Sequence, residues 1–166
     1  MPDCFFSILT FRGDSCKGRS FFIVEGCDQM SWKEIEHTAD VGFEVKAASL
    51  DELFLESALA LYALGYGETE ELGKNYEKRK EILQIDGIDL EELVVSWLNE
   101  LIFIVETRHV LFVPTSVHVI AEPLHITVEG VLSERHGVRL PVKSATYGGL
   151  VIRRYPDPFL RIFLDV

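Results

Sequence analysis

The pattern that most constrains the fold is an apolar helix near the middle of the chain. From residue 90 to residue 105, apolar side chains recur at the three- and four-residue spacing of a helix face. The face consists of Leu90, Leu93, Val94, Trp97, Leu98, Leu101, Ile102 and Val105. So much apolar surface has to be covered by other elements, and we therefore expect this segment to be the central core helix.

Two capping patterns predict where helices begin. Asp89 followed by Glu92 opens the apolar helix, and Ser49 followed by Glu52 opens an earlier one. The earlier helix has a mostly apolar face that includes Leu50, Leu53, Phe54, Ala58 and Leu61. A glycine, either Gly65 or Gly67, is expected to end it.

In the remaining segments, apolar and polar residues alternate as they do in β-strands. Residues 32–36, 41–45 and 82–85 precede the apolar helix, and a run of strands follows it. That run is expected at residues 111–113, 117–121, 125–132, 151–154 and 160–165, with Pro114 and Pro123 as breaks. The predicted class is α+β, with two main helices packed on a mostly antiparallel β-sheet.

Residues 1–30 differ in composition from the rest. They contain Cys4, Cys16 and Cys27 without CxxC spacing, which favours free thiols in a reducing, cytoplasmic compartment. We predict an N-terminal extension over 1–30, either poorly ordered or upstream of a true start at Met30. Residues 31–166 form the predicted folded domain. No apolar run approaches the ~20 residues that span a bilayer, so no membrane association is expected.

The formal net charge of −11 bears on the partners of the chain. Nucleic-acid affinity depends on Lys and Arg neutralising phosphates, so direct binding of RNA or DNA is not expected. A basic protein partner or a cation suits this charge better. The alternative is that the acidity only keeps the protein in solution.

Three places combine residues that could carry chemistry. In the segment 36–40, His37 and Asp40 could form part of a site, or Asp40 and Thr38 could simply cap a turn. In the segment 141–149, Lys143 could neutralise a phosphate or pair with a carboxylate, or it could be an ordinary surface lysine.

The third place is the end of the last strand. Asp165 is followed by the main-chain carboxylate of Val166, and two fixed carboxylates repel each other unless a cation or a lysine lies between them. The alternative is a solvated chain end without a role.

Together these segments resemble the archease family. The resemblance covers about residues 32–166 and rests on several motifs in order. They are Glu36-His37-Thr38-Ala39-Asp40-Val41-Gly42, Ser49-Leu50-Asp51-Glu52-Leu53-Phe54, Trp97-Leu98-Asn99-Glu100-Leu101, Val142-Lys143-Ser144-Ala145-Thr146-Tyr147 and Leu164-Asp165-Val166. Gly148 departs from the family pattern, which has a histidine after the tyrosine.

The resemblance implies an archease-like domain with a strand-helix-strand-strand module. It also implies a protein cofactor, not an enzyme, that activates an RtcB-type GTP-dependent RNA ligase of tRNA splicing. The cofactor promotes guanylylation and multiple turnover of the ligase, which alone handles GTP and tRNA. The implied metal ligands are Asp40, Asp165 and the C-terminal carboxylate of Val166, with His37 as a less certain one, and Lys143 is the implied activating residue.

The chemistry of these residues agrees with that implication. Carboxylate oxygens suit hard divalent cations such as calcium, magnesium or manganese. Two other functions stay open from the residues themselves. One is a stand-alone metal-dependent phosphohydrolase built on Asp40, Asp165 and His37, and the other is a metal-independent protein-binding or assembly module.

Overall fold

The computed structural model describes residues 31–36, 41–67, 76–135 and 137–166. His37 and Asp40, together with the extension predicted over 1–30, lie outside this part of the chain. The elements, in chain order, are β1 (Ser31–Glu36), β2 (Val41–Lys46), α1 (Leu50–Tyr66), β3 (Tyr76–Asp86), α2 (Leu90–Arg108), β4 (Val110–Ala121), β5 (Leu124–Glu134), β6 (Ser144–Arg153) and β7 (Phe159–Asp165).

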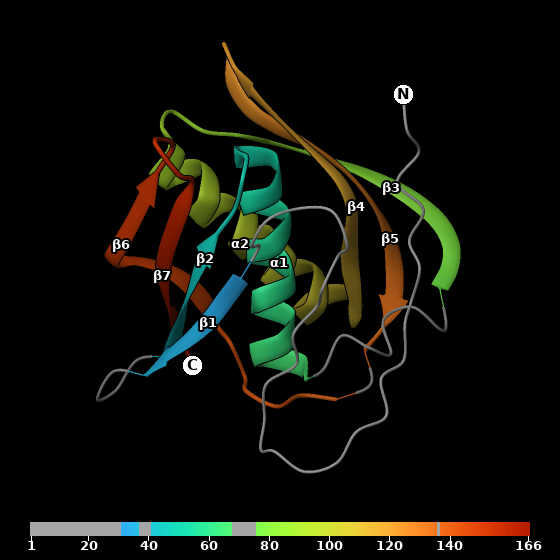
Figure 1. The fold of residues 1–166 in the computed structure, drawn as a ribbon. Helices are drawn as coiled ribbons and strands as arrows, with labels where there is room; N and C mark the ends of the chain where they lie inside the picture. The colour runs from blue at the N-terminus through green and yellow to red at the C-terminus, as the bar shows by residue number, and fades with distance from the viewer. Residues whose placement is uncertain (1–30, 37–40, 68–75, 136) are drawn as a thin grey trace, which may run out of the picture.

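The strands form two antiparallel sheets, and the helices lie between them (Figure 1). A four-stranded sheet has the order β1-β2-β7-β6, and a three-stranded sheet has the order β3-β5-β4. Helix α1 packs on β2 and β4, and α2 packs on β6 and β4, so each helix contacts both sheets. The α+β class and its two main helices are therefore confirmed, with two sheets where the sequence pattern had suggested one.

Both predicted capping patterns are present. The Ser49 hydroxyl accepts a hydrogen bond from Glu52 N at 3.2 Å, and the Glu52 carboxylate accepts one from Ala48 N at 3.1 Å. Asp89 and Glu92 repeat the arrangement at the start of α2, each accepting at 2.8 Å. Helix α1 ends before Gly67, whose φ of 93° is one that other residues rarely adopt.

The prediction that Pro114 separates two strands was wrong. Residues 110–121 form the single strand β4, which continues through Pro114 with a register shift between Pro114 and Ser116. β4 is an edge strand, so a missing N–H and a bulge are tolerated there. Pro123, by contrast, lies in the tight connection between β4 and β5, as predicted.

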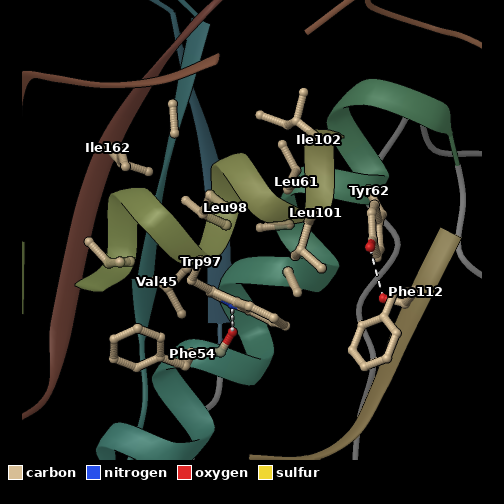
Figure 2. Packing of buried hydrophobic residues seen from close by; sticks show 14 of the residues in the cluster. Val45, Phe54, Leu61, Tyr62, Trp97, Leu98, Leu101, Ile102, Phe112 and Ile162 are labelled. Atoms are coloured by element: carbon tan, nitrogen blue, oxygen red, sulfur yellow. Dashed lines mark hydrogen bonds between the residues drawn. The ribbon is translucent and has the colours of Figure 1, made fainter. Parts of the chain in front are cut away.

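The core is centred on α2, as its apolar face predicts (Figure 2). Trp97 is fully buried, and its indole N–H donates to the main-chain oxygen of Phe54 in α1 at 3.0 Å. Tyr62 of α1 is also fully buried, and its hydroxyl donates to the main-chain oxygen of Phe112 in β4 at 2.8 Å. Each large amphipathic ring thus buries its apolar body while its polar atom finds a partner.

Among the described residues, neither helix is long and apolar enough to cross a membrane.

A buried carboxylate holds the outer side of the four-stranded sheet together. Glu44 of β2 is 6% exposed, and its Oε2 lies 2.7 Å from the ammonium of Lys33 in β1. Its Oε1 accepts from Nε of Arg161 in β7 at 2.7 Å and lies 2.6 Å from Nη2. The hydrogen bond from Lys33 lowers the pKa of Glu44, burial opposes the change, and Arg161 lowers the pKa further.

We predict that Glu44→Gln lowers the free energy of unfolding by about 1–2 kcal/mol at neutral pH, because two charge-assisted contacts are lost. The pKa of Glu44 is lower in the folded state than the ordinary 4.5, so its contribution is present above that pH and disappears as the pH falls through the folded-state value. Urea unfolding at several pH values measures this. The exposed Glu34→Gln on β1 is the matched control, and an equal, pH-independent loss in both variants would contradict the role of Glu44.

Candidate functional site

The described candidate residues meet at one end of the four-stranded sheet. Asp165 ends β7, Val166 follows it, and Lys143 directly precedes β6. The main-chain N–H of Lys143 donates to the main-chain oxygen of Asp165 at 2.8 Å. The Lys143 ammonium donates to the main-chain oxygen of Val166 at 2.9 Å. Two of the three candidate places, distant in sequence, are therefore in direct contact.

β7 occupies an interior position between β2 and β6, and this fixes where the last residues lie. Ser144 of β6 pairs with Asp165, and Val41 of β2 pairs with Leu164. The first residue of β2 is thus in register with the residue just before Asp165. The predicted site residues His37 and Asp40 lie in the segment 37–40 before Val41, outside the described residues.

The polar groups at this end are accessible from solvent. The side chains of Asp165 and Lys143 are exposed, and Val166 is half-buried against the core. The neighbouring Val142 is buried, with its methyl group near Gly65 at the end of α1. The exposed polar groups of Asp165 and Lys143 are thus attached to a backbone whose neighbouring side chains, Val142 and Val166, pack against the core.

The amide side chain of Asn99 in α2 holds the start of β6. Its Oδ1 accepts from the main-chain N–H of Ala145 at 2.8 Å, and its Nδ2 lies 3.3 Å from the main-chain oxygen of the same residue. Both backbone groups of Ala145 are thus bonded by one side chain, two residues after Lys143. The sequence motif contains Asn99, but no role was predicted for it; the available signal was an amide beside Leu98 and Leu101 on an apolar helix.

The glycines after Tyr147 differ in what they require. A Cβ on Gly148 would meet nothing closer than the Thr146 hydroxyl at 3.9 Å, so this position has room for a side chain. Gly149 has a φ of 71°, and a Cβ there would lie 2.8 Å from the Phe163 ring. Packing would therefore allow a histidine at position 148, whereas position 149 requires glycine.

The end of β7 carries donor atoms that suit a metal ion. The Asp165 carboxylate and the adjacent Val166 terminus offer oxygen atoms, the ligand type that hard divalent cations prefer. Among residues 31–36, 41–67, 76–135 and 137–166, no group of three or more His, Cys, Asp or Glu side chains is close enough to hold a metal. The oxygen atoms of Asp165 and Val166 are of the type that such cations bind, but within the described part of the chain they do not make a complete metal site by themselves.

A second polar cluster lies at the start of α1 and was not predicted. Asp51 accepts a hydrogen bond from the main-chain N–H of Val119 in β4 at 2.9 Å, and His118 Nδ1 lies 3.8 Å from its other oxygen. These contacts tie α1 to β4, which is a structural role.

Comparison with known proteins agrees with the fold and with the family resemblance over residues 32–166. Residues 32–166 match the model of the Archease protein family (MTH1598/TM1083). The chain is 32% identical over 131 residues to the protein archease of Methanopyrus kandleri, covering 75% of this chain and 91% of the relative. It is 30% identical over 133 residues to the protein archease of Pyrococcus furiosus, covering 76% and 90%.

Two solved structures share the fold. One is the solution structure of protein 1598 of Methanobacterium thermoautotrophicum, with a TM-score of 0.62, 24% identity, and coverage of 81% of this chain and 98% of that one. The other is the crystal structure of an archease, possible chaperone, from Thermotoga maritima, with a TM-score of 0.50, 21% identity, and coverage of 81% and 96%. With a family match over most of its length, the chain belongs to the archease family.

Proposed function

We propose that this protein is a non-enzymatic cofactor that activates an RtcB-type GTP-dependent RNA ligase of tRNA splicing. Membership of the archease family supports a protein-assisting role, and the Thermotoga maritima archease is described as a possible chaperone. The observation that carries the proposal furthest is the convergence of Lys143, Asp165 and Val166 at one accessible end of the sheet.

The proposed metal site consists of Asp40, Asp165 and the C-terminal carboxylate of Val166, with His37 as a further candidate. The pairing of Val41 with Leu164 supports it, because the chain enters β2 beside the residue that precedes Asp165. A divalent cation held by these oxygens would supply positive charge to phosphate groups of the ligase reaction. The candidate cations are calcium, magnesium and manganese, which all prefer oxygen ligands.

Lys143 has a positioning role in this proposal. Its ammonium contacts the Val166 oxygen, and its N–H contacts the Asp165 oxygen, so it orients both residues from the neighbouring strand. A positive charge at this distance also offsets the repulsion between two neighbouring carboxylates. Because the lysine is exposed, the same ammonium can contact the partner ligase once the proteins associate.

The ligase step that benefits is the transfer of a guanylate from GTP to a histidine of the ligase. Phosphoryl-type transfers depend on positioning and on cations that neutralise charge at the phosphates. An acidic protein that carries a cation at an exposed edge can bring that charge to the ligase without touching RNA. RNA and GTP are in this view contacts of the ligase only.

We expect Asp165→Ala and Asp40→Ala to abolish the acceleration of ligase guanylylation while the melting temperature changes little, because both remove proposed oxygen ligands. Incorporation of labelled guanylate into the ligase, with and without chelator, measures this. Asp157→Ala, an exposed carboxylate elsewhere, is the control. Full acceleration by both variants would exclude the metal role, and hydrolysis of phosphate esters by the chain alone would favour the phosphohydrolase instead.

We expect a Gly-Ser extension after Val166 to weaken metal binding and activation, since a peptide group replaces the terminal carboxylate. Titration calorimetry with Ca²⁺, Mg²⁺ and Mn²⁺ compares the extended chain with one ending at Val166. The same extension, released at Val166 by a protease, is the control and should restore binding. An extended protein with unchanged affinity and activity would rule out the Val166 carboxylate as a ligand.

We expect Asn99→Ala to cost about 1–3 kcal/mol of stability, because the bonds to both backbone groups of Ala145 are lost. If the clamp also orients Lys143, activation should fall at temperatures where the variant is fully folded. Circular dichroism defines those temperatures, and guanylylation assays follow. Glu100→Ala, on the next helix position, is the control; normal activation by a folded Asn99→Ala protein would limit Asn99 to stability.

A further inference from the structure

The outer face of the four-stranded sheet carries a group of basic side chains. Residues paired directly across antiparallel strands point to the same side of the sheet, so the register assigns side chains to faces. The side away from the helices has one cation on each strand, and we call these four residues the basic face: Lys33 on β1, Lys46 on β2, Arg161 on β7 and Arg153 on β6.

All four cations are accessible. The Lys33 side chain is 69% exposed and that of Arg161 is 45% exposed, and Lys46 and Arg153 are also exposed. Glu44 lies between Lys33 and Arg161, but it is buried and already paired with both. One negative charge is thus neutralised within the sheet, and the basic face has an excess of three positive charges.

This local charge is opposite to that of the whole chain, whose formal net charge is −11. The same side of the sheet carries Asp165 at the other end of β7, four residues beyond Arg161. At about 3.3 Å per residue, the two are roughly 13 Å apart along the strand. The outer side is therefore basic near Lys46 and acidic near the chain end.

Two of the cations are held in fixed orientations. The Arg153 guanidinium lies 4.8 Å from the centre of the Phe159 ring, in the range of cation–π contact. Arg161 is fixed by Glu44 and lies 6.0 Å from the same ring. Guanidinium groups held in this way lose little freedom when they bind a carboxylate in a two-pronged arrangement.

The dimensions of the basic face suit a short anionic peptide segment as the ligand. Adjacent strands are about 4.8 Å apart, so four strands with one cation each span roughly 14 Å. An extended peptide covers this distance with four or five residues at about 3.3 Å each. A Glu- or Asp-rich segment of that length would place its carboxylates along the row of cations.

A nucleic acid fits this face less well. A strand longer than a few nucleotides would extend past the basic face onto the rest of a molecule whose formal net charge is −11, which disfavours phosphates. Base stacking needs an open aromatic ring, and Phe159 is only 8% exposed beneath the arginines. The short length of the basic face and its covered ring both favour a peptide.

We propose that the basic face of the sheet docks a short acidic segment of a partner protein. This inference goes beyond the metal-dependent activation proposed above and involves neither Asp165 nor Lys143 directly. It adds a second contact, on the same side of the sheet as the chain end, through which a partner can be held while its reactive groups approach that end.

The test uses the full-length chain and a fluorescein-labelled peptide of six glutamates, with binding followed by fluorescence anisotropy at low salt. The doubly substituted Lys46→Glu/Arg153→Glu protein should bind the peptide at least about fivefold more weakly. The matched control is Lys80→Glu/Arg139→Glu, which makes the same change in net charge at exposed positions off the basic face. It should stay within about twofold of the unaltered chain.

Three results would overturn the proposal. They are no peptide binding by the unaltered chain, an equal loss in both doubly substituted proteins, and tighter binding of a twelve-nucleotide oligouridine than of the peptide. The last result would identify a nucleic-acid surface. Neither ligase nor metal is present in the assay, so a negative outcome does not bear on the proposed activation. In the same way, a failure of activation would not contradict binding of the peptide.

Discussion

The hydrogen bonds that hold β7 between β2 and β6 determine where Asp165 and Val166 lie at the candidate site. An interior strand has partners on both edges, so its final residues are fixed to the degree that the sheet is fixed. The contacts of Lys143 with Asp165 and Val166 exist only because β6 is in register with this strand. Without the pairing, Asp165 and Val166 would have no defined position relative to Lys143.

The rigidity of that sheet comes in turn from α2. Trp97 and its apolar neighbours fill the space between the two sheets. The side chain of Asn99, on the same helix, forms hydrogen bonds with the backbone of Ala145. One helix therefore provides both the apolar packing that orders the molecule and the polar contact that fixes the start of β6. Accessible polar groups on a well-packed base are a common arrangement for binding sites, because little is reorganised when a partner arrives.

Local patterns in the sequence were enough to predict the helices and most strands. The capping residues Ser49 and Asp89 act within one helical turn, so their effect can be read without knowing the fold. The continuous strand through Pro114 was not predicted. A strand tolerates an internal proline when it lies at the edge of a sheet, and the edge position of β4 is a property of the whole sheet. The role of Asn99 and the basic face also depend on pairing between distant segments, which a single sequence does not reveal. The family resemblance predicted His37 and Asp40 as ligands, and these predictions lie outside the described residues.

The interior position of β7 also matters for how the protein is made. During synthesis β2 leaves the ribosome early, whereas β7, its neighbour in the sheet, emerges after all the other described elements. Until then β2 presents an unpaired edge, and the apolar faces of Phe43 and Val45 lack part of their cover. A nascent chain therefore exposes this edge until residues 159–165 have been made, and a chain that stops before residue 159 lacks the strand that pairs with both β2 and β6.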